Sequence, residues 1–302
     1  MTDDVLRTLL TALTPSKEKV DAYLADTYVL ETVDQAQRLG IDAERFSYQH
    51  SLLLLKPDAI VARAVEPTLE WLAANEFQVV DARRVVVDRH VARALWYFAW
   101  NIASPERRRL ADLLVGISDV LVLVVRGPVG ELPTPVRLAE TKGATDPRKR
   151  RPGDLRYLLG RHNYLLNLVH SPDDPADVLR ELAIYFDENT RADVFARALD
   201  GHDRSGDAAA LGRALYDETP ARSFERADAA ARLRDELGTA ATESPEHTDA
   251  DAALLEAAWS SGRDLDPWSL IVLGSYLLPM RTGSGSQTLR PVGATDWLEA
   301  RP

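Results

Sequence analysis

The sequence predicts an α+β fold, in which a ferredoxin-like four-stranded antiparallel sheet carries helices on one face and is flanked by all-helical regions. Between residues 51 and 187, short apolar runs of strand type alternate with apolar residues at helical spacing, in the order strand, helix, strand, strand, helix, strand. On both sides of this segment the apolar residues recur at helical spacing. These two observations define the fold class.

The strands are predicted from apolar runs bounded by turn residues. They are expected at residues 52–55, 77–87, 119–125 and 164–169. The first run, Leu52 to Leu55, is apolar throughout and is typical of a fully buried strand. Pro57 follows it and ends the hydrogen-bond ladder.

The central helices are predicted from apolar spacing and from their start signals. They are expected around residues 65–72, from Asp88, from Ser104-Pro105 to about Ile117, from Thr134-Pro135, and from Asp174-Pro175 to Phe186. A capping residue followed by proline at the first helical position is typical of a helix start. Three of these five helices carry that signal.

The chain divides into three predicted regions: a helical N-terminal extension (1–50), a central domain (51–187) and a mainly helical C-terminal region (188–302). Gly40 is placed to end a helix of the extension. The C-terminal region predicts helices at residues 208–216, at 224–237 and from Asp266-Pro267, with a polar break at 239–249. The Gly-Ser stretch 283–286 lacks the lysine and preceding strand of a phosphate loop, so we interpret it as a linker.

Composition restricts the function classes. The 302 residues are 45% apolar, which supports a buried core, and no run approaches the ~20 apolar residues that cross a bilayer. The longest, residues 268–280, predicts a buried helix. The net charge of -11 argues against general nucleic-acid binding. The absence of cysteine excludes disulfides and thiolate sites and suits a reducing compartment, so we expect a soluble cytoplasmic protein without membrane partners.

The most informative local feature is a histidine at the end of an apolar run. His170 closes the segment Asn167-Leu168-Val169-His170, and Glu181 follows on a predicted helix. An imidazole can act as a nucleophile, and a carboxylate on its other nitrogen selects its tautomer. The alternative is a hydrogen-bonded histidine of the core.

Three motifs in this order resemble those of the nucleoside diphosphate kinase family. They are Lys56-Pro57-Asp58 after the first strand, the loop Gly143-Ala144-Thr145-Asp146-Pro147 followed by Pro152-Gly153 and Arg156, and Asn167-Leu168-Val169-His170 with Glu181. The resemblance covers about residues 51–187. It implies a ferredoxin-like fold and transfer of a phosphoryl group from a nucleoside triphosphate such as ATP, with Mg²⁺, through a phosphohistidine to a nucleoside diphosphate. It also implies a homo-oligomer.

The resemblance also implies roles for individual residues. His170 matches the nucleophile and Glu181 its orienting carboxylate. Lys56, Thr145 and Arg156 match residues that contact the sugar and the phosphates, Asn167 matches the ribose contact, and Asp173 matches the aspartate near the metal. Tyr97, next to Trp96, is the chemical match for the tyrosine that approaches the phosphohistidine. Arg137 and Lys142 are candidates for a second phosphate-binding cation.

Several positions depart from the family pattern. Ser171 and Pro172 stand where glycine and serine usually follow the histidine, and Ala139 stands where the second arginine is expected. The aromatic residue that stacks on the base should fall near Arg107, but this sequence has no Phe or Tyr there. The run Arg148 to Arg151 is interpreted as a solvated loop that helps to attract an anionic nucleotide. A catalytically degenerate nucleotide-binding or assembly module therefore stays open as the alternative function.

Overall fold

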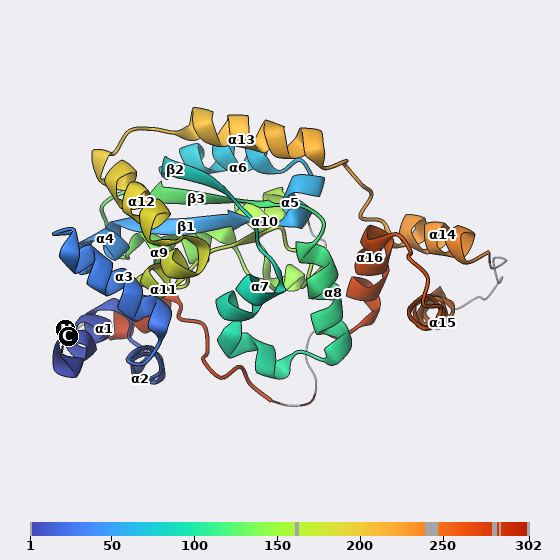
Figure 1. Ribbon diagram of the computed structural model, residues 1–302, viewed down its shortest axis with the longest axis horizontal. Helices are drawn as coiled ribbons and strands as arrows, with labels where there is room; N and C mark the ends of the chain where they lie inside the picture. The colour runs from blue at the N-terminus through green and yellow to red at the C-terminus, as the bar shows by residue number, and fades with distance from the viewer. Residues whose placement is uncertain (1, 161–162, 239–246, 280–282, 284, 301–302) are drawn as a thin grey trace.

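The computed structural model describes residues 2–160, 163–238, 247–279, 283 and 285–300. Its centre is a four-stranded antiparallel sheet in the order β2-β3-β1-β4 (Figure 1). The strands are β1 (His50–Leu55), β2 (Gln78–Val85), β3 (Val120–Arg126) and β4 (Val169–His170). This sheet confirms the predicted ferredoxin-like α+β fold and its element order.

The fourth strand is much shorter than predicted. Residues 164–168 do not join the sheet, because the Asn163 side chain accepts the N–H groups of Leu165 and Leu166 and bends the chain into a turn. Leu168 then adopts a positive φ of 68° and donates its N–H to Asp58 Oδ2 at 2.9 Å. His170 is the last residue of β4 rather than the residue after it.

Helices cover both faces of the sheet, whereas the sequence predicted helices on one face. Inward residues of β1 and β3 on one face pack against α5 (Pro57–Val61), α6 (Val65–Ala74), α9 (Thr134–Lys142) and α13 (Ser205–Glu218). The other face packs against α3 (Thr27–Arg38), α4 (Ala43–Gln49), α7 (Arg89–Leu95), α11 (Pro175–Tyr185) and α12 (Glu188–Asp200). Helices from the N-terminal and C-terminal regions thus contribute to the core of the sheet. The sequence patterns had predicted this core from the central region alone.

The segment between β2 and β3 forms a helical hairpin beside the sheet (Figure 1). It consists of α7, the 3-10 helix η1 (Tyr97–Ile102) and α8 (Pro105–Val115). Asp88 and Ser104 accept hydrogen bonds from backbone N–H groups of the two α-helices, as the sequence predicted. The C-terminal helix α16 (Pro267–Leu277) packs on α8 so closely that a Cβ at Gly274 would lie 2.8 Å from Leu110 Cδ1.

The N-terminal extension is helical, as expected. It forms α1 (Asp3–Leu13), α2 (Lys17–Tyr23), α3 and α4. Gly40, with φ of 68°, follows the end of α3. Apolar residues of α1, α2 and α3 pack together against Ala176 and Leu179 of α11, so the extension covers the helix that follows β4.

The C-terminal region contains the predicted helices and others that the sequence did not indicate. The predicted ones are α13, α14 (Arg226–Leu237) and α16; α12, α15 (His247–Ser260) and α17 (Ala294–Glu299) were missed. Most of the predicted polar break, 239–246, lies outside the described residues, as do Met280 and Ser284. Ser286 accepts a hydrogen bond from Asn101 of η1, so the end of the Gly-Ser stretch lies against the hairpin. Among the described residues, no helix is long and apolar enough to cross a membrane.

Candidate functional site

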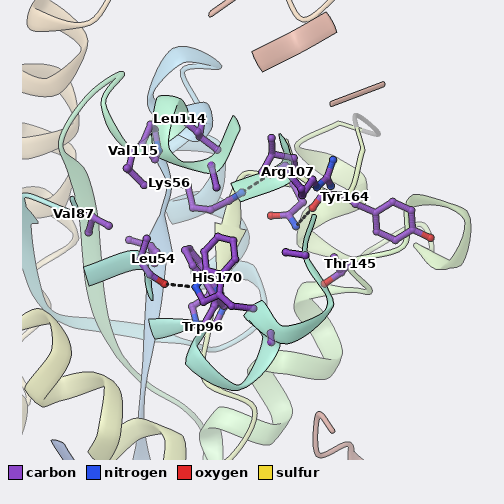
Figure 2. Close-up of a pocket in the computed structure, with 18 of the residues that line it drawn as sticks. Leu54, Lys56, Val87, Trp96, Arg107, Leu114, Val115, Thr145, Tyr164 and His170 are labelled. Atoms are coloured by element: carbon purple, nitrogen blue, oxygen red, sulfur yellow. Dashed lines mark hydrogen bonds between the residues drawn. The ribbon is translucent and has the colours of Figure 1, made fainter. Parts of the chain in front are cut away.

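Two cavities meet at His170, between the sheet, the hairpin and the start of α11. One, of about 250 Å³, is lined mainly by apolar residues of the hairpin and of β1, and Figure 2 shows it. The other, of about 210 Å³, is lined largely by polar and charged side chains. Residues that line both are Trp96, Ala99, Thr145, Arg156, His170 and Gln287. We call them the apolar cavity and the polar cavity.

The imidazole of His170 is oriented by a carboxylate. His170 pairs with Leu54 in the sheet, and α11 carries Glu181 back towards it. His170 Nε2 lies 2.9 Å from Glu181 Oε1, and the histidine side chain keeps 20% of its surface exposed. With a proton on Nε2 donated to Glu181, Nδ1 carries a free lone pair; it forms no hydrogen bond among the described residues. The arrangement can therefore present a nucleophilic nitrogen to either cavity.

Of the two candidates for a second phosphate-binding cation, Lys142 lines the polar cavity. It is the last residue of α9, it is buried, and its Nζ donates to Ser171 Oγ at 2.6 Å. Burial and, less strongly, the Arg156 guanidinium lower the pKa of Lys142 to about 7. Ser171 is engaged by this lysine and not by Glu181, whose Oε2 is buried without a hydrogen-bond partner among the described residues.

Lys56 and Arg156 line the cavities but also hold the surrounding loops. Lys56 Nζ donates to the carbonyl of Leu165 at 2.7 Å and lies 3.4 Å from Asp58 Oδ2. Arg156 donates to the carbonyls of Gly143 and Val169 and to Thr145 Oγ1, at 3.0, 2.6 and 3.2 Å. Burial lowers the pKa of Arg156 to about 9 and also lowers that of Lys56. Both side chains remain on the cavity wall, where an anion could reach them.

Asn167 and Thr145 also line the cavities. Asn167 lines the apolar cavity and donates from Nδ2 to the carbonyl of Tyr164 at 2.9 Å. Thr145 lines both cavities. Arg150 differs from the solvated position expected for the basic run: it is buried and donates to the carbonyls of Ala144, Thr145 and Gly160.

Two predicted contacts lie away from the cavities. Tyr97 is 65% exposed and packs against Phe98, whereas Trp96 sets its ring edge against His170 with the centroids 5.5 Å apart. The aromatic neighbour of the histidine is therefore Trp96, because the turn from α7 into η1 directs Tyr97 outward. Arg137 pairs with Glu76 at 3.4 Å and lines neither cavity.

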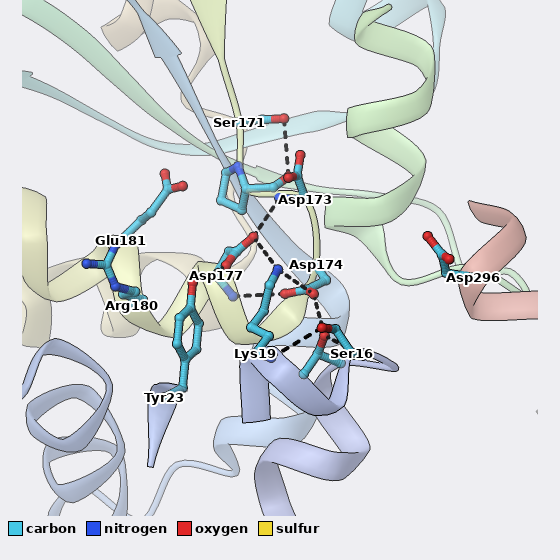
Figure 3. A network of polar contacts seen from close by, with 12 residues as sticks. Ser16, Lys19, Tyr23, Ser171, Asp173, Asp174, Asp177, Arg180, Glu181 and Asp296 are labelled. Atoms are coloured by element: carbon cyan, nitrogen blue, oxygen red, sulfur yellow. Dashed lines mark hydrogen bonds and ion pairs between the residues drawn. The ribbon is translucent and has the colours of Figure 1, made fainter. Parts of the chain in front are cut away.

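A buried charge network joins the N-terminal extension to this site (Figure 3). Lys19 of α2 lies 2.8 Å from Asp174 and 2.9 Å from Asp177, and Tyr23 donates to Asp177. Asp173 lines the polar cavity, and burial together with the neighbouring Asp177 raises its pKa. The sequence carried no local signal for Lys19 or Tyr23, because they lie more than a hundred residues before the histidine.

The geometry and the comparisons together identify the chain. Fold and site define an α+β protein of ferredoxin-like topology that presents a histidine–glutamate pair between two cavities lined by cations. The family model for nucleoside diphosphate kinase matches residues 49–190, and the chain belongs to the nucleoside diphosphate kinase family. The helices at both ends lie outside that match.

Individual relatives are similar over the same region. The nucleoside diphosphate kinase of Thermomicrobium roseum is 30% identical over 158 residues, which are 50% of this chain and 96% of the relative. That of Bdellovibrio bacteriovorus is 28% identical over 148 residues, 49% of this chain and 99% of the relative. A solved nucleoside diphosphate kinase from Borrelia burgdorferi with bound vanadate and ADP is 22% identical with a TM-score of 0.41, covering 47% of this chain and 88% of that one.

Proposed function

We propose that the protein is a phosphotransferase that moves the terminal phosphoryl group of a nucleoside triphosphate, through a phosphohistidine at His170, to a nucleoside diphosphate or a related acceptor. Family membership supports nucleotide phosphotransfer in general. The observation that carries the specific mechanism is the His170–Glu181 pair, in which Nδ1, where the two cavities meet, forms no hydrogen bond with the described residues.

The proposed reaction proceeds by two displacements. Nδ1 of His170 attacks the γ-phosphorus, the bond from that phosphorus to the β-γ bridging oxygen breaks, and the diphosphate leaves. A second diphosphate then attacks the phosphohistidine and regenerates the free imidazole. Glu181 accepts the hydrogen bond from Nε2–H throughout and stabilises the positive charge that develops on the ring. Lys142, Arg156 and Thr145 are placed to offset charge on the transferred oxygens.

Mg²⁺ fits this site as a companion of the nucleotide. Among the described residues no group of three or more histidine or acidic side chains could hold a metal ion. Mg²⁺ commonly keeps several waters and binds one or two carboxylates together with substrate phosphates, so Asp173 on the wall of the polar cavity would suffice. Bound there, the ion would neutralise phosphate charge.

The alternative is a nucleotide-binding module without efficient turnover. It is favoured by Lys56 and Arg156, which donate to backbone carbonyls, and by Glu181, whose second oxygen has no hydrogen-bond partner in the part of the chain that the structure describes. In this case the site would bind nucleotide, while the flanking helices would contact partners.

Labelling with γ-labelled ATP separates the two functions. The phosphotransferase should acquire an acid-labile label that ADP or GDP removes as the triphosphate. His170→Ala should acquire none, and the exposed His90→Ala serves as the matched control that labels normally. ATP binding by calorimetry with no label on the wild-type protein would instead support the binding module. The homo-oligomeric state, the cytoplasmic location and the three-region division remain predictions; light scattering tests the first.

A further inference from the structure

The apolar cavity contains a buried arginine without a partner. Arg107 of α8 is 6% exposed and lines this cavity. Among the described residues its guanidinium forms no ion pair and no hydrogen bond, and its Nη1 is completely buried without an acceptor. Lys56 and Arg156, the other cations on this wall, both donate to protein oxygens. The Arg107 guanidinium, by contrast, donates to no protein oxygen among the described residues.

Helix formation does not require this guanidinium. The backbone N–H of Arg107 donates to Ser104 Oγ at 3.0 Å, and that contact caps α8 whatever the side chain at position 107. Burying a cation without a counter-charge disfavours the folded state, and desolvation lowers the pKa of Arg107 to about 10. An anion entering the cavity would supply the missing counter-charge.

Arg107 lies apart from Lys142 and Asp173, two of the residues proposed to act on the phosphates and the metal. It lines the apolar cavity only, whereas Lys142 and Asp173 line the polar cavity only. Figure 2 shows Arg107 and Tyr164 on one side of the apolar cavity, apart from His170 and Trp96. A nucleotide whose phosphates lie between Lys142 and Asp173, with its ribose near Asn167, would therefore leave Arg107 unpaired. A neutral nucleoside in the apolar cavity would leave its charge uncompensated as well.

We propose that the apolar cavity binds a small organic anion, whose apolar body packs against residues such as Trp100, Ile102 and Leu114 and whose carboxylate or phosphate pairs with Arg107. A carboxylate or a phosphate can accept two parallel N–H bonds from one guanidinium. The volume of about 250 Å³ limits the ligand to a small molecule. The role of this anion as phosphoryl acceptor rests on the proposed function, but its binding does not.

Calorimetry with matched pairs of probes tests the inference. The pairs are phenylacetate with phenylacetamide and phenyl phosphate with phenol, so each anion has a neutral counterpart with the same ring. The wild-type protein should bind at least one anion about tenfold or more tightly than its neutral counterpart, as expected for a desolvated charge-assisted pair. Arg107→Met should abolish that preference, and Arg107→Lys, which keeps the charge, should retain part of it. Arg108→Met, one residue along the same helix and outside the cavity, is the matched control and should keep the preference.

Ligand-free thermal unfolding provides a second readout. Arg107→Met should be at least as stable as the wild-type protein, because it replaces an unpaired buried charge by an apolar side chain. Equal binding of charged and neutral probes would overturn the inference. So would no binding of either anion, or a selective loss of GTP binding in Arg107→Met, which would assign the arginine to a base. Repeating the titrations with His170→Ala distinguishes the two proposals: anion binding should survive there even if phosphorylation proves absent.

Discussion

The pH dependence of nucleotide binding should follow the protonation of Lys142. This lysine is buried on the wall of the polar cavity, and burial lowers its pKa to about 7. Within the described part of the chain, its Nζ contacts Ser171 and forms no ion pair with a carboxylate. Lys142 is therefore mostly charged at pH 6 and mostly neutral at pH 8. A phosphate group that requires the charged form will bind less tightly as the pH rises through 7.

The size of the effect follows from the populations. With a pKa of about 7, the charged fraction falls from roughly nine tenths at pH 6 to roughly one tenth at pH 8, so the apparent Kd should rise about tenfold. The contribution of Lys142 to the stability of the ligand-free protein should instead increase as the pH rises. The folded state holds fewer protons on this lysine than the unfolded state above pH 7, so the contribution of Lys142 to stability increases with pH there.

Calorimetric titration with a non-hydrolysable ATP analogue and Mg²⁺ at pH 6, 7 and 8 measures the effect. Lys142→Arg is the matched control, because it keeps a cation that does not titrate in this range. Titration of the nucleotide itself contributes equally to both proteins and cancels in the comparison. The wild-type Kd should rise about tenfold relative to the variant. Parallel pH profiles for the two proteins would refute the assignment of Lys142 to phosphate binding.

Two further predictions concern the charges around Asp173. Lys19→Met should destabilise the fold by about 3–5 kcal/mol, because it leaves Asp174 and Asp177 buried without their cation. Burial raises the pKa of Asp174 to about 6, so the loss of unfolding free energy, measured in urea, should be larger at pH 8 than at pH 5. A loss below about 1 kcal/mol at pH 8 would contradict this prediction. Chelation of Mg²⁺ should weaken ATP binding to the wild-type protein. Asp173→Asn should reduce this dependence of ATP binding on Mg²⁺, whereas the control substitution of the exposed Asp203 by Asn should not. Equal Mg²⁺ dependence in all three proteins would show that Asp173 does not bind the metal.

Signals between neighbouring residues predicted most of the central elements. The caps at Ser104 and Asp174 formed as expected, because a capping side chain and the N–H groups that it accepts lie within one turn of each other. The length of β4 was mispredicted in part because a distant residue limits it: besides the local turn at Asn163, Asp58 from the start of α5 takes the N–H of Leu168. The apolar pattern of residues 164–169 does not indicate the contact between Asp58 and Leu168.

The sequence by itself determined the sheet, the family and the pairing of His170 with Glu181. These features depend on local signals: the strand and helix patterns, the family motifs, and the short turn between the histidine and the helix that carries the glutamate. Only the tertiary structure decided which neighbouring groups face the histidine. It placed Trp96 rather than Tyr97 against the ring and brought Lys142 rather than Arg137 to the polar cavity. It also left Arg107 buried with no counter-charge from the described residues. These outcomes depend on how the hairpin, α9 and the flanking helices pack on one another, and side-chain direction and desolvation follow from that packing rather than from spacing along the chain.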